Sequence, residues 1–139
     1  MNVILLTEDR ELDSRLVRQA LAGTSIDLHC VNTGEDCLMF LRKQGAYFDA
    51  PTPDLVLLDL SLPGMDGREV LLEIKRDKDL KYLPVVIFTG AMEERDLFRQ
   101  YEAGCSGYIV KPNDYDELTR TLRSIITYWF YVVVLPRKA

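Results

Sequence analysis

The chain has 139 residues, 47% of them hydrophobic, and a formal net charge of -5. This length fits one ordinary domain with a buried core and is too short for two independent domains. The acidic balance argues against a nucleic-acid surface, because phosphate binding requires clustered Lys and Arg and the basic runs here are no longer than pairs such as Arg137-Lys138.

The sequence predicts a cytoplasmic protein that does not span a membrane. Segment 1–10 lacks the basic region and small-residue cleavage site of a signal peptide. The longest apolar stretch, 128–135, is far shorter than the roughly 20 residues that a membrane-spanning helix needs. The three cysteines show no CxxC spacing, so we expect them to be reduced.

Five short apolar runs predict the strands of a parallel α/β sheet that is covered on both faces, because each run is followed by a polar or glycine-rich turn and a segment of helical period. The expected strands are 2–7, 27–31, 55–59, 85–89 and 107–110. The expected helices lie within 12–21, from the turn at 33–35 to 41, and over 68–75, 92–103 and 115–128.

Polar side chains stand at the carboxyl ends of four of these strands. They are Thr7, Glu8 and Asp9 after the first strand, Asp59 at the end of the third, Thr89 at the end of the fourth, and Lys111 with Pro112 after the fifth. Because an open parallel sheet binds its ligand beyond the carboxyl ends of its strands, we expect these residues to line one site.

The residue types in this group favour phosphoryl chemistry. Three converging carboxylates repel one another unless a divalent cation neutralises them, and oxygen ligands suit Mg²⁺. A Thr hydroxyl and a Lys ammonium would donate to an anion on the other side of the site. A carboxylate can itself take a phosphoryl group as an aspartyl phosphate, and Asp59 is the best candidate because its strand is central and the following turn leaves it accessible.

The ordered set Glu8-Asp9, Asp59, Thr89 and Lys111-Pro112, with LPGMDG after Asp59, resembles the receiver domains of two-component response regulators over residues 2 to about 128. The resemblance implies a doubly wound, five-stranded, flavodoxin-like α/β fold. It also implies that Asp59 is the phosphoacceptor for a sensor histidine kinase, and that Mg²⁺ is the cofactor. The implied Mg²⁺ ligands are Asp9, Asp59, the Ser61 backbone carbonyl and, through water, Glu8.

The same resemblance assigns the remaining roles in the site. Thr89 and Lys111 would bind the phosphoryl oxygens. Tyr108, three residues before Lys111, would turn inward with Thr89 as the switch. The Lys111-Pro112 peptide bond would be cis. A regulator of this kind catalyses only its own phosphorylation and dephosphorylation, and is not an enzyme acting on a free substrate.

An apolar segment follows the last predicted helix and has no polar face of its own. This segment and the stretches RKQGAYFDAPTPD and DGREVLLEIKRDKDLKYLPVV resemble the small stand-alone regulators paired with bacterial and cyanobacterial phytochrome kinases. The resemblance implies a receiver over 1–128 and a dimerising extension over 129–139. The alternative is that the extension folds back over its own domain. The expected dimer residues are Tyr128, Trp129, Phe130, Tyr131, Val133 and Leu135.

Other interpretations remain open. Asp59 could simply cap the following turn, Tyr108 could be a packing aromatic, and the effect of Arg10, where the family often has a small polar or acidic residue, is not predicted. A pseudo-receiver would keep the fold without phosphorylation. A haloacid dehalogenase-type phosphatase also uses a strand-end Asp, but it requires a second acid two residues later, where this chain has Ser61. With no DNA-binding module after the domain, we expect output through an unidentified protein partner.

Overall fold

Five parallel strands form the centre of the molecule in the computed structural model, which describes residues 2–90 and 92–136. In chain order they are β1 (Asn2–Thr7), β2 (Ile26–Val31), β3 (Leu55–Leu58), β4 (Val85–Thr89) and β5 (Gly107–Val110). Their order in the sheet is β2-β1-β3-β4-β5, so the chain turns back at β1 and the sheet is doubly wound. The predicted flavodoxin-like fold is confirmed.

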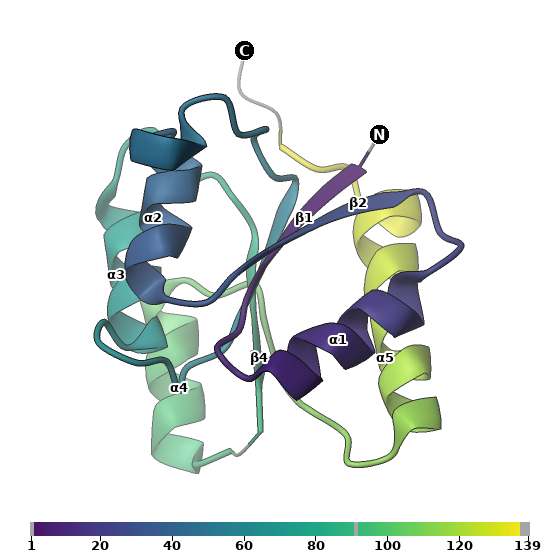
Figure 1. The fold of residues 1–139 in the computed structure, drawn as a ribbon. Coiled ribbons are helices and arrows are strands. Elements are labelled where there is room, and N and C mark those ends of the chain that lie inside the picture. Colours follow the sequence, from purple (N-terminus) through teal and green to yellow (C-terminus); the bar gives the residue numbers. More distant parts are fainter. Residues whose placement is uncertain (1, 91, 137–139) are drawn as a thin grey trace.

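Helices cover both faces of the sheet (Figure 1). On one side lie α1 (Glu11–Leu21) and α5 (Tyr115–Thr127), and on the other lie α2 (Gly34–Arg42), α3 (Gly67–Arg76) and α4 (Glu94–Ala103). A short 3-10 turn, η1 (Gly45–Tyr47), follows α2, and a π-helical turn, η2 (Tyr128–Val132), continues α5. The predicted element order is confirmed.

The predicted boundaries differ slightly from the observed ones. β2 begins at Ile26 rather than residue 27, and α4 begins at Glu94 rather than residue 92. β3 ends at Leu58, so Asp59 is the first residue beyond the strand rather than its last. The Asp59 amide still donates to the Thr7 carbonyl oxygen at 3.1 Å, which holds the residue beside the end of β1.

The central strand β3 is buried on both faces, as its unbroken apolar sequence predicts: Leu55 to Leu58 are all 0% exposed. Alternate side chains along β1 and β3 enter two separate cores, one under α2 and α3 and the other under α1 and α5. Cys37 and Cys105 lie in the first core, and all three cysteines are free thiols. The rigid centre of the sheet therefore leads directly to Asp59.

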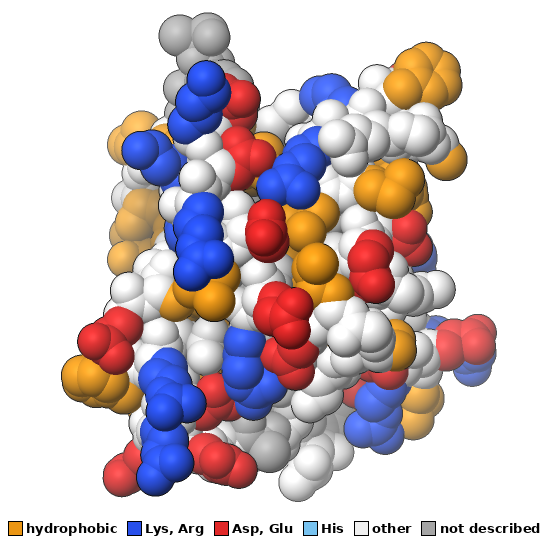
Figure 2. Space-filling model, turned by 90° about the vertical axis from the view of Figure 1, so that its left-hand side faces the viewer, with side chains coloured by type: hydrophobic (Ala, Val, Ile, Leu, Met, Phe, Trp, Pro, Cys, Tyr) orange, Lys and Arg blue, Asp and Glu red, His pale blue; other side chains and the backbone are white. Residues whose placement is uncertain are grey.

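The surface over α2, α3 and α4 carries acidic and basic side chains close together, with apolar patches between them (Figure 2). Several of the charges are paired between helices, as in the contacts of Arg42 on α2 with Glu73 and Asp77 at the end of α3. Over the described ranges, none of the helices has the length and apolar character needed to cross a membrane.

Candidate phosphoryl-transfer site

The carboxyl ends of β1, β3, β4 and β5 bring the predicted polar residues to one edge of the sheet. Thr7 is in register with Leu58, and Thr89 is in register with Val110. The Lys111 amide continues this pairing by donating to the Thr89 carbonyl oxygen at 2.7 Å. The residues that follow these strands therefore meet although they are far apart in sequence.

Asp59 lies at the centre of the group and is only 4% exposed. Its Oδ1 accepts hydrogen bonds from the Thr89 hydroxyl at 2.9 Å and from the Ser61 amide at 3.1 Å. Its Oδ2 is 3.0 Å from the Lys111 ammonium. Burial alone would raise the pKa of Asp59, but the charge and hydrogen bond of Lys111, a hydrogen bond with Glu8 and the Ser61 amide together hold that pKa below its ordinary value, so the carboxylate is ionised at neutral pH.

Lys111 binds three carboxylates at once. Its ammonium contacts Glu8 Oε1, Asp59 Oδ2 and, at 3.0 Å, Asp13 Oδ2. Burial would lower the pKa of Lys111, but the neighbouring carboxylates raise it above the ordinary value. Asp13 was not predicted as a member of this site. The sequence feature that could have indicated Asp13 is its position in the first turn of the helix that follows the Glu8-Asp9 pair.

Three carboxylates form a pocket suited to a divalent cation. Glu8, Asp9 and Asp59 each offer one oxygen, and these oxygens lie within 4.8 Å of one another. Glu8 is 1% exposed, and burial raises its pKa to about 7 even though Lys111 acts in the opposite direction. One ammonium therefore does not compensate the cluster fully. A hard cation with oxygen ligands would supply the missing positive charge, so the residues present fit Mg²⁺ or Mn²⁺.

The expected cis bond at Lys111-Pro112 is wrong: all peptide bonds within residues 2–90 and 92–136 are trans. The trans form is the intrinsically preferred one before proline, by about 0.5–1 kcal/mol. Lys111 is directed into the site instead by its backbone bond to Thr89 and by its three carboxylate partners.

Arg10 lies at the outer side of the same edge. Its guanidinium Nε is 3.9 Å from Asp13 Oδ2, and its side chain is 70% exposed. The Arg10 amide donates to Glu8 Oε2 at 3.3 Å. Arg10 therefore touches the acidic cluster from the solvent side.

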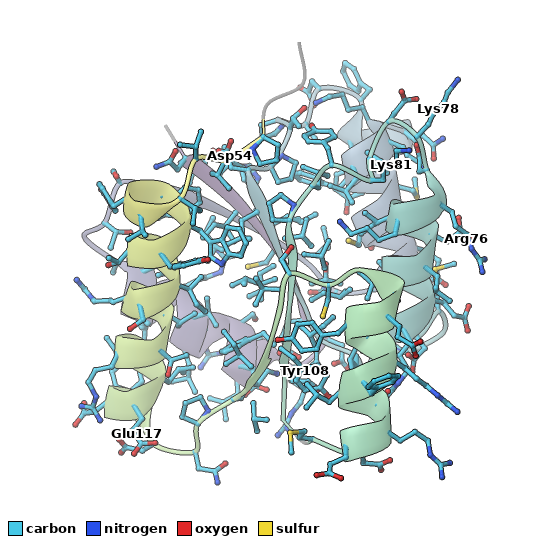
Figure 3. All side chains as sticks on the ribbon, turned by 180° about the vertical axis from the view of Figure 1, so that it is seen from behind. Asp54, Arg76, Lys78, Lys81, Tyr108 and Glu117 are labelled. Carbon is cyan, nitrogen blue, oxygen red and sulfur yellow. The ribbon has the colours of Figure 1, made fainter. Side chains whose placement is uncertain are left out.

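Tyr108 lies on β5 beside α4, as Figure 3 shows, and is half-buried against the core under α2 and α3. In the part of α4 near this face, Asp96 binds Arg68 from α3 through two hydrogen bonds, of which the one from Arg68 Nε is 2.7 Å long. Both packing and switching are compatible with this position of Tyr108.

The C-terminal extension divides its apolar side chains between the core and solvent. Trp129 and Phe130 pack against the core under α1 and α5, so the extension partly folds back. Tyr131, Val132 and Val134 of the extension are exposed, as is Tyr128 directly before it, with exposed fractions between 51% and 96%. Val133 and Leu135, which the sequence placed on the dimer surface, are half-buried. Residues 137–139, also part of the predicted extension, lie outside the described residues.

The fold and the site together define a response regulator receiver. The family model of the response regulator receiver domain matches residues 4–123, and the chain belongs to this family of signalling proteins. The chain is 43% identical to the response regulator Rcp1 of Synechocystis sp. over 136 residues, which cover 96% of this chain and 92% of Rcp1.

Solved structures extend the comparison to nearly the whole chain. The crystal structure of the Mn²⁺-bound form of Rcp1 is 41% identical with a TM-score of 0.89, over 99% of this chain and 100% of the other. The phosphorylated cyanobacterial phytochrome response regulator RcpA is 38% identical with a TM-score of 0.94, over 98% and 99% of the two chains. The predicted similarity to phytochrome response regulators is confirmed.

Proposed function

We propose that this protein accepts a phosphoryl group on Asp59 from a sensor histidine kinase and signals through protein contacts. The observation that carries the proposal is the environment of the Asp59 carboxylate. One of its oxygens is bound by Thr89 and the other by Lys111, while Glu8 and Asp9 approach from the metal side. Donors for an anion and ligands for a cation thus meet at one ionised nucleophile.

The reaction requires little of the protein beyond positioning and charge. An Asp59 oxygen forms a bond to phosphorus while the bond from phosphorus to the kinase histidine breaks, and the departing imidazole takes a proton from solvent water. Lys111 and Thr89 hold phosphoryl oxygens as charge develops on them. Glu8, Asp9, Asp59 and the Ser61 carbonyl would hold Mg²⁺, which would neutralise part of the charge on the transferred group.

The kinase is proposed to be a phytochrome, and the site of action the cytoplasm. The support is the similarity over nearly the whole chain to RcpA, whose name describes it as a cyanobacterial phytochrome response regulator. We further propose that the Thr89 hydroxyl moves to the phosphoryl group and that Tyr108 then packs further inward beside α4. The downstream partner would bind the surface that this change alters.

Intact-protein mass spectrometry after incubation with acetyl phosphate and Mg²⁺ tests the acceptor. We expect a mass gain of about 80 Da, which corresponds to one added HPO₃ group in an aspartyl phosphate. Asp59→Asn should show no gain, because the amide is not a nucleophile in this reaction, and EDTA should prevent the gain in the wild-type protein. Asp49→Asn is the matched control, since it makes the same change at an exposed position, and it should behave as the wild type.

The alternatives predict different results in this experiment or in an assay of phosphate release. A folded wild-type protein without any mass gain would indicate a pseudo-receiver. Continuous release of phosphate from several unrelated phosphomonoesters would indicate a phosphatase of the haloacid dehalogenase type. A gain that persists in Asp59→Asn would place the acceptor at another residue and contradict the proposal.

The C-terminal extension is proposed to form a two-fold dimer with a second copy of the chain, with 1–128 as the receiver proper and 129–139 as the dimerising segment. Support comes from the exposed group Tyr128, Tyr131, Val132 and Val134, which lies within residues 128–134, the segment that continues the packed helix α5. It adjoins a groove of about 450 Å³ lined by residues that include Ile109, Ile125 and Trp129. In a two-fold dimer the same apolar surface of each copy packs against its counterpart, which removes both surfaces from water.

We expect the doubly substituted Tyr131→Ser, Val134→Ser protein to sediment as a monomer at micromolar concentrations at which the wild type sediments as a dimer. The reason is that both side chains are largely exposed, so their loss removes apolar contact area between copies and little from the core. The matched control is the double change Leu12→Ser, Phe48→Ser, which alters two other exposed apolar residues and should leave the dimer intact. A monomeric wild type would contradict the dimer.

A further inference from the structure

Asp13 contacts Lys111 without belonging to the predicted metal ligands. Its Oδ2 is 3.0 Å from Lys111 Nζ, the same distance that separates Nζ from Asp59 Oδ2. Among the described acids, the group whose oxygens lie close enough to share a cation consists of Glu8, Asp9 and Asp59. Asp13 therefore approaches the site from α1 and reaches only its ammonium.

The donors of Lys111 are all in use. An ammonium has three N–H groups, and three carboxylates accept from it: Glu8, Asp13 and Asp59. A phosphoryl oxygen that binds Lys111 must therefore displace one of these acceptors or share a donor with it. Asp13 can keep its hydrogen bond to Lys111 when Asp59 is phosphorylated, because the Asp13 side chain comes from a different element and is 21% exposed.

We propose that Asp13 is a positioning residue that competes with the phosphoryl group for Lys111 and thereby sets how tightly the site holds an anion at Asp59. This inference rests on the proposed function, and it acts through Lys111 rather than through contact with the transferred group. Charge-assisted hydrogen bonds to carboxylates are the strong ones, so a carboxylate at 3.0 Å is an effective competitor.

The substitution Asp13→Asn separates charge from shape. The amide keeps the size of the side chain and an acceptor oxygen, but it removes the negative charge beside Lys111. The site then becomes more favourable for an anion both because Lys111 is more available and because one repulsive charge is gone. Even at the dielectric constant of bulk water, a unit charge about 4 Å from the anion changes the anion affinity by about fivefold.

Glu11→Gln is the matched control because it removes an equal charge from the same turn of α1. The Glu11 side chain is 86% exposed and pairs with Arg15 at 3.2 Å, away from Lys111. If only the net charge of the helix start matters, both variants should behave alike. If contact with Lys111 matters, only Asp13→Asn should change.

The experiment is a ¹⁹F NMR titration of beryllofluoride, a mimic of the phosphoryl group, at saturating Mg²⁺. We expect Asp13→Asn to bind beryllofluoride about fivefold more tightly than the wild type, and Glu11→Gln to stay within about twofold. In the acetyl phosphate reaction, the concentration giving half the maximal rate should fall for Asp13→Asn. A general loss of structure would not produce tighter binding, and Asp13→Ser serves as a second variant if the first does not fold.

Equal affinities for Asp13→Asn and Glu11→Gln would overturn the inference, since the effect would then be one of overall charge. Weaker binding by a folded Asp13→Asn would also overturn it, since Asp13 would then support the bound anion instead of competing with it. Failure of the wild-type protein itself to bind beryllofluoride would contradict the proposed function, which is a separate and recognisable result.

Discussion

Lys111→Met is expected to lower the free energy of unfolding by about 3 kcal/mol at pH 8 without Mg²⁺, the size of loss typical when one partner of a buried ion pair is removed. The Lys111 side chain is 12% exposed, and the side chains of its partners Glu8 and Asp59 are 1% and 6% exposed. Methionine fills a similar volume but leaves these carboxylates without their cation. Urea unfolding followed by circular dichroism measures the loss.

The pH dependence of this loss of stability follows from the shifted pKa values of Lys111 and Glu8. The pKa of Lys111 is raised above its ordinary value of 10.5, so its stabilising contribution is fully present below that pH and is lost only as the pH rises through the folded-state pKa. Glu8 has a pKa of about 7, so it is largely ionised at pH 8 and protonated at pH 5.5. The cost of Lys111→Met should therefore be smaller at pH 5.5, where Glu8 needs no counter-charge.

Mg²⁺ provides the second arm of this test. Because the cation would bind the carboxylates that Lys111 leaves behind, Mg²⁺ should stabilise Lys111→Met more than it stabilises the wild type. The matched control is Lys78→Met at an exposed position, which should change stability by no more than about 0.5 kcal/mol. Equal losses at the two pH values, with no additional benefit from Mg²⁺, would show that the carboxylates of the site are not the partners that Lys111 compensates.

The strand ends were the part of the site that sequence could predict. A buried parallel strand is an apolar run, so a carboxylate directly after Leu58 stands out, as do Thr89 and Lys111 after their own runs. Parallel topology then places these ends on one edge, because every strand points in the same direction. Local pattern and a general rule of sheet geometry were enough for these residues.

Asp13 could not be found by the same reasoning. It follows Asp9 by four residues, but Asp9 precedes the first turn of α1, so the pair does not share a regular helical face. Whether Asp13 meets Lys111 depends on how α1 packs relative to the end of β5, directly after which Lys111 lies, and this is a tertiary property. The trans state of the Lys111-Pro112 bond could not be predicted from local sequence either. The two isomers before proline differ in free energy by only about 0.5–1 kcal/mol, so tertiary contacts select one.

The C-terminal extension shows a third limit of prediction from the sequence. An unbroken apolar segment carries no period, so its sequence cannot say which side chains face the core. The π-helical turn Tyr128–Val132 decides this by placing Trp129 and Phe130 inward while Tyr131 and Val132 stay exposed. Val132 and Val134 are consequently exposed, while Val133 and Leu135, which the sequence placed on the dimer surface, are half-buried.

Gly67→Ala is expected to destabilise the fold by about 3 kcal/mol, at the upper end of the cost of overpacking, although the change adds one methyl group. Gly67 is the first residue of α3, and its amide donates to the Leu60 carbonyl oxygen at 3.0 Å. A Cβ atom here would lie 2.1 Å from the Asp59 carbonyl oxygen and 2.7 Å from the Leu60 Cα. Both contacts are with backbone, which cannot move aside by changing a rotamer.

Relief of this clash must displace either α3 or the backbone of Asp59 itself. The protein that remains folded should therefore take up phosphoryl groups from acetyl phosphate at least about tenfold more slowly, because a displacement of about 1 Å at a reacting group costs rate steeply. Gly90→Ala is the matched control: an added Cβ meets nothing within 4 Å there, so stability should change by no more than about 0.5 kcal/mol. Thermal unfolding and the phosphorylation rate would be measured on both variants. If Gly67→Ala lost stability but kept its phosphorylation rate, the start of α3 would not determine where Asp59 lies, and the prediction would be wrong.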